Sequence, residues 1–267
     1  MPDKEILVDY STTFASGRDL ENASQALTRG GIPFHLYTAE PGYSRVGTAV
    51  LRTGMEGRAL LGEIRNITCA GWVEYRQPAV EVPASPPPQF AEDQFGQAAV
   101  VYLAPCVADL SRIRLIAHVS GDLTQVLPYL NGNMPGAFYN HELPSLTLMD
   151  GYRMVVLYPK RISVAKADEL VDGWRTLETL RNLINQTWQR RAEIAPSTLS
   201  RQRPPALEIY WRLPGTNCRE CGEKVCMAFA LRLWKGELKP ALCKPVFEGN
   251  RQDLKPALLE ICAGLGI

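Results

Sequence analysis

Four cysteines near the C-terminal end of this 267-residue chain constrain its fold more than any other feature. They follow a C-x2-C-x4-C-x16-C pattern at Cys218, Cys221, Cys226 and Cys243. In a reducing compartment, clustered thiols bind metal more often than they form disulfides. The spacing therefore predicts a metal or iron–sulfur centre within residues 213–245.

The second half of the pattern indicates which centre the cysteines favour. Structural zinc is usually held by two short knuckles with two ligands each, whereas here the second half is the lone Cys243. Four thiolates are the ligand set of an iron–sulfur cubane. We predict one [4Fe-4S] cluster. The alternatives that the spacing leaves open are a [2Fe-2S] cluster, structural zinc and a disulfide pair.

The residues around the cysteines suit a loop that wraps a cluster and then enters a helix. Gly215 and Gly222 permit tight backbone turns. From Cys226 the apolar spacing predicts a helix that ends at Gly236. A helix N-terminus favours a thiolate through its macrodipole. The side chains predicted to give apolar cover are Met227, Phe229 and Trp234.

This segment reads TNCRECGEKVCMAFALRL and is followed by C-x-P. It resembles the four-cysteine [4Fe-4S] domain of the corrinoid iron–sulfur protein large subunit, which also occurs in the B subunit of Rnf-type complexes. The resemblance implies that Cys218, Cys221, Cys226 and Cys243 are the cluster ligands. It covers only about residues 207–248. This chain shows neither the corrinoid-binding and barrel portions of the first protein nor the further ferredoxin-like cysteine runs of the second. The resemblance therefore implies the cluster domain but not the functions of those larger proteins.

A wider stretch, residues 98–248, is similar to uncharacterised iron–sulfur-domain proteins of anaerobes. In those proteins a segment like LYPKRISVAKADELVDGWRTLETLRNLINQTW precedes the cluster domain. The similarity implies an anaerobic setting but brings no known activity.

The rest of the chain predicts an α+β protein, with two small α/β domains followed by the small iron–sulfur domain. The predicted segments are an N-terminal α/β domain at 1–83, a proline-rich linker at 84–97, a central α/β domain at 98–195 and a C-terminal [4Fe-4S] domain at 206–267. Three consecutive prolines make the linker a short stiff spacer.

Hydrophobic periodicity places the main elements inside these segments. Arg18–Arg29 has helical spacing and is followed by two glycines. Arg112–Val119 alternates like a half-buried strand. Asp150-Gly151 predicts a β-hairpin turn. The strongest helical pattern runs from Lys166 to about Glu193.

Composition and charge exclude several function classes. The formal net charge of +1, with Lys and Arg scattered, gives no sign of a nucleic-acid partner. No apolar run approaches the roughly 18–20 residues of a membrane span. The N-terminus shows no secretion signal. We therefore expect a cytoplasmic protein without a membrane span, and its oligomeric state stays open.

Other chemistry-bearing residues lack a motif. Cys69, Cys106 and Cys262 are isolated in apolar surroundings and are interpreted as core residues, with participation in a metal site left open. The three histidines are far apart, and no nucleophile elbow, Walker loop or dinucleotide fingerprint is present. The basic residues among the ligands are interpreted as solvated surface rather than a partner-binding collar. They are Arg219, Lys224, Arg232, Lys235, Lys239 and Lys244.

Together these features predict an iron–sulfur protein that passes single electrons through one cluster to or from a redox protein or a larger metalloenzyme complex of anaerobic metabolism. Four cysteine ligands leave no open iron position, which favours electron transfer over substrate chemistry. A non-catalytic protein is therefore expected. The first alternative is an accessory or maturation protein for a metallo- or corrinoid enzyme. The second is an enzyme whose active site lies in the first two domains, with the cluster as an electron relay.

Overall fold

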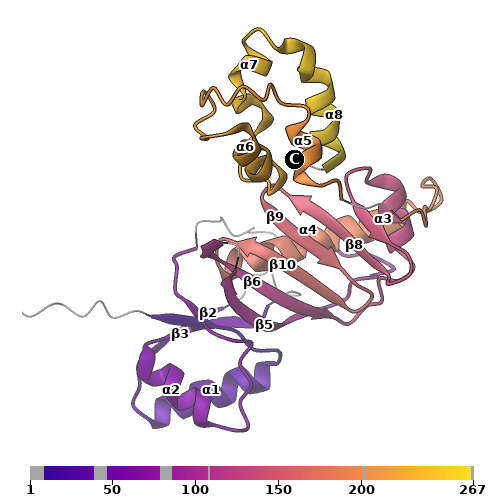
Figure 1. Cartoon of the computed structure of the whole chain (residues 1–267). Helices are drawn as coiled ribbons and strands as arrows, with labels where there is room; N and C mark the ends of the chain where they lie inside the picture. The colour runs from indigo at the N-terminus through magenta and orange to yellow at the C-terminus, as the bar shows by residue number, and fades with distance from the viewer. Residues whose placement is uncertain (1–8, 39–46, 79–85, 108, 201–202, 266–267) are drawn as a thin grey trace, which may run out of the picture. The chain divides into compact units, whose positions relative to one another are not determined.

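The computed structural model describes residues 9–38, 47–78, 86–107, 109–200 and 203–265 (Figure 1). The chain divides into two compact units, each built from two stretches of sequence. Unit 1 comprises residues 1–126 and 159–190, and unit 2 comprises residues 127–158 and 191–267. The mixture of helices and antiparallel sheets confirms the α+β class. The unit boundaries cut through the predicted central domain, and the predicted domain limits stay a prediction.

The N-terminal part of unit 1 is a four-stranded sheet in the order β2-β3-β1-β4, accompanied by two helices. The bounds are β1 Tyr10–Thr12, α1 Gly17–Arg29, β2 Phe34–Thr38, β3 Ala49–Thr53, α2 Met55–Glu63 and β4 Val73–Glu74. The strand–helix–strand order does not produce two neighbouring parallel strands. Strand β3 lies between β1 and β2 and pairs antiparallel with both.

Helix α1 ends where the two glycines predict, and it begins one residue before the predicted Arg18. The Ser16 side chain caps it by accepting a hydrogen bond from the Asp19 amide at 3.2 Å. Gly31, just beyond the helix, has a φ of 67°, which glycine adopts readily. The apolar face of α1 packs into a small core. That core consists of Phe14, Ala23, Leu27, Leu51 and Leu61.

Three further strands of unit 1 pair antiparallel in the order β5-β6-β10. They are β5 Ala98–Cys106, β6 Asp109–Val119 and β10 Arg161–Ala167. Ile113, Leu115 and Ala117 of β6 are all buried. The alternation predicted for this strand, with one face in the core, is therefore confirmed.

Helix α4 spans Leu170–Gln189, so the predicted start at Lys166 is wrong by four residues. The strand β10 continues through Lys166, whose backbone has a φ of 66° that interrupts regular structure. The helix starts only where Glu169 caps it. This carboxylate accepts hydrogen bonds from the amides of Val171 at 2.6 Å and Asp172 at 2.8 Å.

The proline-bearing segment before β5 is bonded to α4 through a buried arginine. Arg181 is fully buried. Its guanidinium donates to the Pro88 carbonyl at 3.1 Å and forms ion pairs with Asp93 at 2.9 Å and Glu178 at 3.1 Å. The segment therefore packs along the helix instead of running free as a spacer. Arg181 and Glu178 are both buried, although charged side chains on a helix usually face solvent.

Burial gives the Glu169 cap a pH dependence that can be tested. Burial, opposed by its two backbone hydrogen bonds, raises the pKa of Glu169 from 4.5 to about 6. The folded protein thus binds this proton more tightly than the unfolded chain does, so stability falls as pH rises from 4.5 through about 6. Between these pH values the free energy of unfolding should fall by about 2 kcal/mol more in the parent than in Glu169→Gln. Urea unfolding at several pH values measures the difference, and identical pH profiles would contradict it.

Unit 2 opens with a short helix and an antiparallel three-stranded arrangement. The bounds are α3 Leu127–Asn133, β7 Phe138–Asn140, β8 Ser145–Asp150 and β9 Arg153–Leu157. The predicted hairpin is confirmed, since β8 and β9 pair from Asp150 opposite Arg153. Gly151 in its turn has a φ of 58°.

The C-terminal part of unit 2 is helical, and α5, α6 and α8 lie side by side (Figure 1). The elements are α5 Ala206–Tyr210, α6 Cys226–Trp234, α7 Lys244–Phe247 and α8 Lys255–Leu265, with 3-10 turns at Pro240–Leu242 and Gln252–Leu254. Among the described residues, none of the helices has the length and apolar character needed to cross a membrane.

Candidate functional site

A loop of unusual backbone conformation carries the first two cysteines of the pattern. Gly215 and Gly222 have φ values of 71° and 86°, as the predicted tight turns require. Asn217 and Arg219, on either side of Cys218, also have positive φ values, 52° and 65°. Such conformations are costly for residues with a side chain and cluster at functional sites. The loop is thus wound tightly around Cys218.

The third cysteine stands at the first position of helix α6, as predicted. The Cys226 amide donates a hydrogen bond to the Asn217 side-chain oxygen at 2.8 Å, which ties the loop to the helix start. Val225, the residue before the helix, provides no side-chain cap. The helix end is also as predicted, with Gly236 following at a φ of 72°.

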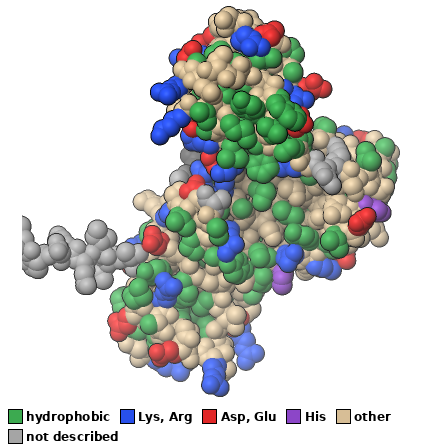
Figure 2. Space-filling view, in the orientation of Figure 1, with side chains coloured by type: hydrophobic (Ala, Val, Ile, Leu, Met, Phe, Trp, Pro, Cys, Tyr) green, Lys and Arg blue, Asp and Glu red, His purple; other side chains and the backbone are tan. Residues whose placement is uncertain are grey.

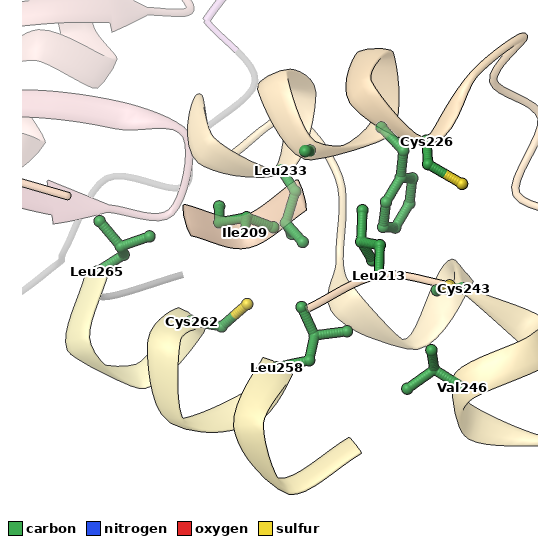
Figure 3. Close-up of a cluster of buried hydrophobic side chains, with 11 residues drawn as sticks. Ile209, Leu213, Cys226, Leu233, Cys243, Val246, Leu258, Cys262 and Leu265 are labelled. Carbon is green, nitrogen blue, oxygen red and sulfur yellow. The ribbon is translucent and has the colours of Figure 1, made fainter. Parts of the chain in front are cut away.

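A compact apolar core supports these elements (Figure 3). Its buried members are Ile209, Leu213, Cys226, Phe229, Ala230, Leu233, Cys243, Val246, Leu258, Cys262 and Leu265. In Figure 3 the Cys226 sulfur points away from the packed side chains, whereas the Cys262 sulfur points in among them. Exposure also differs within the pattern, because Cys218 is exposed, Cys221 half-buried, and Cys226 and Cys243 buried.

The other three cysteines of the pattern influence the pKa of Cys243. The pKa of Cys243 is raised to about 11, chiefly by burial and to a smaller extent by charge repulsion from Cys221, Cys226 and Cys218. A hydrogen bond from the Val246 amide acts in the opposite direction. A cation that binds these sulfurs must therefore displace their protons, as is general for thiolate ligation.

Within the described residues, no group of three or more His, Cys, Asp or Glu side chains forms a ready-made metal-ion site. The four thiols lie on the wound loop, at the start of α6 and directly after a 3-10 turn.

The remaining cysteines lie in separate cores. Cys262 is buried in the helical core of unit 2, and burial raises its pKa to about 11. Cys106 is buried at the end of β5. Cys69 packs against the small core beside α1, and burial raises its pKa. None of the three acts on the pKa of Cys243. Their interpretation as core residues fits these positions.

The three histidines are in different elements. His35 is exposed on β2, His118 is exposed on β6, and His141 is exposed after β7. The ring of His141 lies 3.5 Å from the Tyr139 hydroxyl. The predicted absence of a shared histidine motif is consistent with this scatter.

Two residues that sequence reasoning missed support the cysteine loop and helix α6. Asn217 carries the only predictive signal, because asparagine tolerates left-handed backbone better than most residues. Arg203 stacks on the Trp234 ring at 3.8 Å and donates to the Trp234 carbonyl. No sequence signal links these two positions, which lie 31 residues apart.

Replacing Asn217 tests the loop directly. Asn217→Ala removes the acceptor for the Cys226 amide and places alanine in left-handed backbone, so it should destabilise the apoprotein by about 1–2 kcal/mol. Asn217→Gly loses the hydrogen bond alone and should cost less. Urea unfolding followed by circular dichroism measures both. Thr216→Ala, at the exposed neighbouring position, is the control, and an equal effect of Thr216→Ala and Asn217→Ala would contradict the role of Asn217.

The class of the C-terminal segment follows from its geometry and from a family comparison. Residues 213–245 match the family model FeS, described as "Putative Fe-S cluster". This segment is an iron–sulfur-cluster domain, and the resemblance expected from its cysteine motif is confirmed.

Particular relatives share this part of the chain. The similarity is 41% identity over 69 residues to acetyl-CoA decarbonylase/synthase complex subunit gamma 2 of Methanosarcina thermophila, covering 22% of this chain and 15% of that protein. It is 38% over 64 residues to the corrinoid/iron-sulfur protein large subunit of Moorella thermoacetica, covering 22% and 14%. The chain thus matches only about a seventh of these relatives' length. No solved structure gives a significant match.

Proposed function

We propose that Cys218, Cys221, Cys226 and Cys243 hold one [4Fe-4S] cluster, through which this protein passes single electrons to or from a protein partner. The observation that carries the proposal is the wound loop. Its positive φ values wind the chain around Cys218, and the Asn217 side chain ties it to Cys226 at the start of α6. Such a cluster supplies reversible one-electron chemistry when bound.

The donor set fits that group. The loop, the helix start and the 3-10 turn supply four thiols, and four thiolates are what a cubane takes. The positive φ values on either side of Cys218 let consecutive residues fold around a bulky centre. Because all four ligands are cysteine, no iron position is left for a substrate, which favours electron transfer over catalysis.

Different residues of this chain would have different roles around the proposed cluster. Leu213 and Phe229 are buried beside Cys226 and exclude water from the inner side. Cys218 is exposed, which leaves the outer side accessible to an electron donor or acceptor. The start of α6 directs its amide dipoles toward the Cys226 thiolate and stabilises its negative charge. Exposure and local hydrogen bonds are among the factors that set the reduction potential of such a centre.

The names of the relatives support an anaerobic, multiprotein setting. Subunits of acetyl-CoA decarbonylase/synthase complexes and a corrinoid/iron-sulfur protein share this domain. We propose a redox protein or a larger metalloenzyme complex as the partner, and the cytoplasm as the place of action. The other activities of those relatives are not proposed, since the match is confined to about a fifth of this chain.

A redox cycle tests the proposal and separates it from a maturation role. The protein is purified anaerobically, reduced with dithionite and reoxidised by a protein acceptor, with visible absorbance and iron content followed throughout. The expected result is one electron per chain per cycle, with unchanged iron content. Transfer of the intact cluster to an apoprotein during the cycle would contradict electron transfer and indicate the maturation alternative. Cys262→Ala is the matched control and should cycle like the parent.

A further inference from the structure

The cysteine ligand positions are flanked by exposed cations. Arg219 follows Cys218, Lys224 precedes Cys226 by two residues, and Lys244 follows Cys243. Lys239 lies at the start of the 3-10 turn that leads to Cys243. All four cations are exposed. Because each is at most four residues from a proposed ligand, its Cα lies within about 14 Å of that ligand's Cα.

The nearby carboxylates do not neutralise this charge equally. Glu223 and Glu237 both pair with Arg232, the latter at 3.3 Å, so this group of three side chains carries one net negative charge. Glu220 is the third and last acid of residues 213–245, and it is exposed. Residues 213–245 hold six Lys and Arg against three Glu, a formal net charge of +3, so the segment that carries the ligands is positive.

Exposed apolar side chains also lie close in sequence to the same cysteines. Val225 and Met227 flank Cys226, Leu231 lies one helical turn beyond Met227, and Leu242 precedes Cys243. Their exposed fractions are 42%, 38%, 41% and 45%. Single exposed apolar residues are ordinary, but four beside one site mark an interaction surface. Figure 2 shows Lys and Arg side chains projecting beside hydrophobic ones on the part of unit 2 that carries α6 and α7.

We propose that these eight residues form a docking face for a protein whose own surface is rich in carboxylates around an apolar centre. We call this face the cluster rim. It consists of Arg219, Lys224, Lys239 and Lys244 with Val225, Met227, Leu231 and Leu242. The inference rests on the proposed function and names the chemistry of its partner. The cations steer an acidic partner toward the ligands, and the apolar side chains hold the two proteins in contact. This revises the sequence-based interpretation of the basic residues as plain solvated surface.

Binding to an acidic [2Fe-2S] ferredoxin, used as the probe, tests the cluster rim. The dissociation constant is measured by titration calorimetry with the full chain carrying its cluster. Raising the salt from about 0.02 M to about 0.2 M should weaken binding about tenfold or more, because exposed charges are screened over that range. Binding that is absent, or unaffected by salt, overturns the inference.

Charge reversal at the rim gives the matched comparison. Lys224→Glu with Lys239→Glu should weaken ferredoxin binding at low salt by about tenfold or more. The control, Arg29→Glu with Arg175→Glu, changes net charge by the same amount at exposed positions in unit 1 and should leave binding within about twofold of the parent. Equal effects of the two variants overturn the inference. Leu242→Gln should weaken binding without changing its salt dependence, which checks the apolar contribution.

Two further measurements keep the outcomes distinct. If vesicles containing anionic lipid bind the parent, and rim reversal abolishes that binding while ferredoxin does not bind, the rim is a membrane surface and the proposal is wrong. Reduction of every variant by dithionite is recorded separately. If the cluster is reduced and reoxidised normally but the protein does not bind ferredoxin, only the docking face is refuted. A cluster that does not cycle refutes the proposed electron transfer.

Discussion

Anaerobically purified Cys226→Ala should lack the brown absorbance and the iron of the parent protein. The same loss of essentially all iron is expected when Cys218, Cys221 or Cys243 is replaced, because a cubane needs all four thiolates to be held stably. Alanine at the first position of α6 is a good helix residue, so the helix itself should survive the change. Absorbance between 350 and 450 nm, with iron analysis, is the measurement.

The chain supplies its own controls for this prediction. Cys262→Ala and Cys106→Ala remove buried thiols outside the pattern and should keep full iron content. Each should cost about 1–2 kcal/mol of stability, because a small buried side chain is shortened. Retention of iron in Cys243→Ala together with its loss in Cys262→Ala would mean that the fourth ligand was assigned to the wrong residue.

Arg181→Met should be among the most destabilising single substitutions in unit 1. It leaves the carboxylates of Asp93 and Glu178 without the guanidinium that compensates their burial. Burial alone would raise the pKa of Asp93, yet hydrogen bonds from Gly96, Asn185 and Arg181 hold that pKa below its usual value. Breaking one partner of a buried ion pair costs about 3–5 kcal/mol. Urea unfolding of the variant measures this cost.

An exposed arginine of the same helix is the control for that substitution. Arg175→Met should change stability by at most about 0.5 kcal/mol. Adding Asp93→Asn to Arg181→Met should recover part of the lost stability, because the remaining buried charge is reduced. If Arg181→Met and Arg175→Met unfold at the same urea concentration, the ion pairs of Arg181 do not stabilise the fold, and the prediction is wrong.

The site was the most predictable part of this molecule. Its spacing, its glycines and the helix starting at Cys226 are local features, and ligand chemistry restricts them to few interpretations. The left-handed backbone at Arg219 was not predictable, because arginine has no preference for it. The pairing of Arg232 with Glu223 was not predictable either, since it spans nine residues in sequence.

The fold was harder to predict for reasons of distance along the chain. Helix α1 follows from its own cap and glycines. Arg181, by contrast, is buried only because Asp93 and Pro88, about ninety residues earlier, meet it. The antiparallel pairing of β1 and β2 with β3 likewise depends on a partner strand that local patterns do not reveal. Tertiary contacts of this kind override local propensity.

The central claim is tested most directly by iron and acid-labile sulfide analysis, combined with EPR before and after dithionite, on anaerobically purified full-length protein. The account predicts about four iron and four sulfide per chain, no signal in the oxidised protein and a one-electron paramagnetic signal on reduction. Protein that contains zinc in place of iron, or that shows neither sulfide nor a signal on reduction, would contradict it.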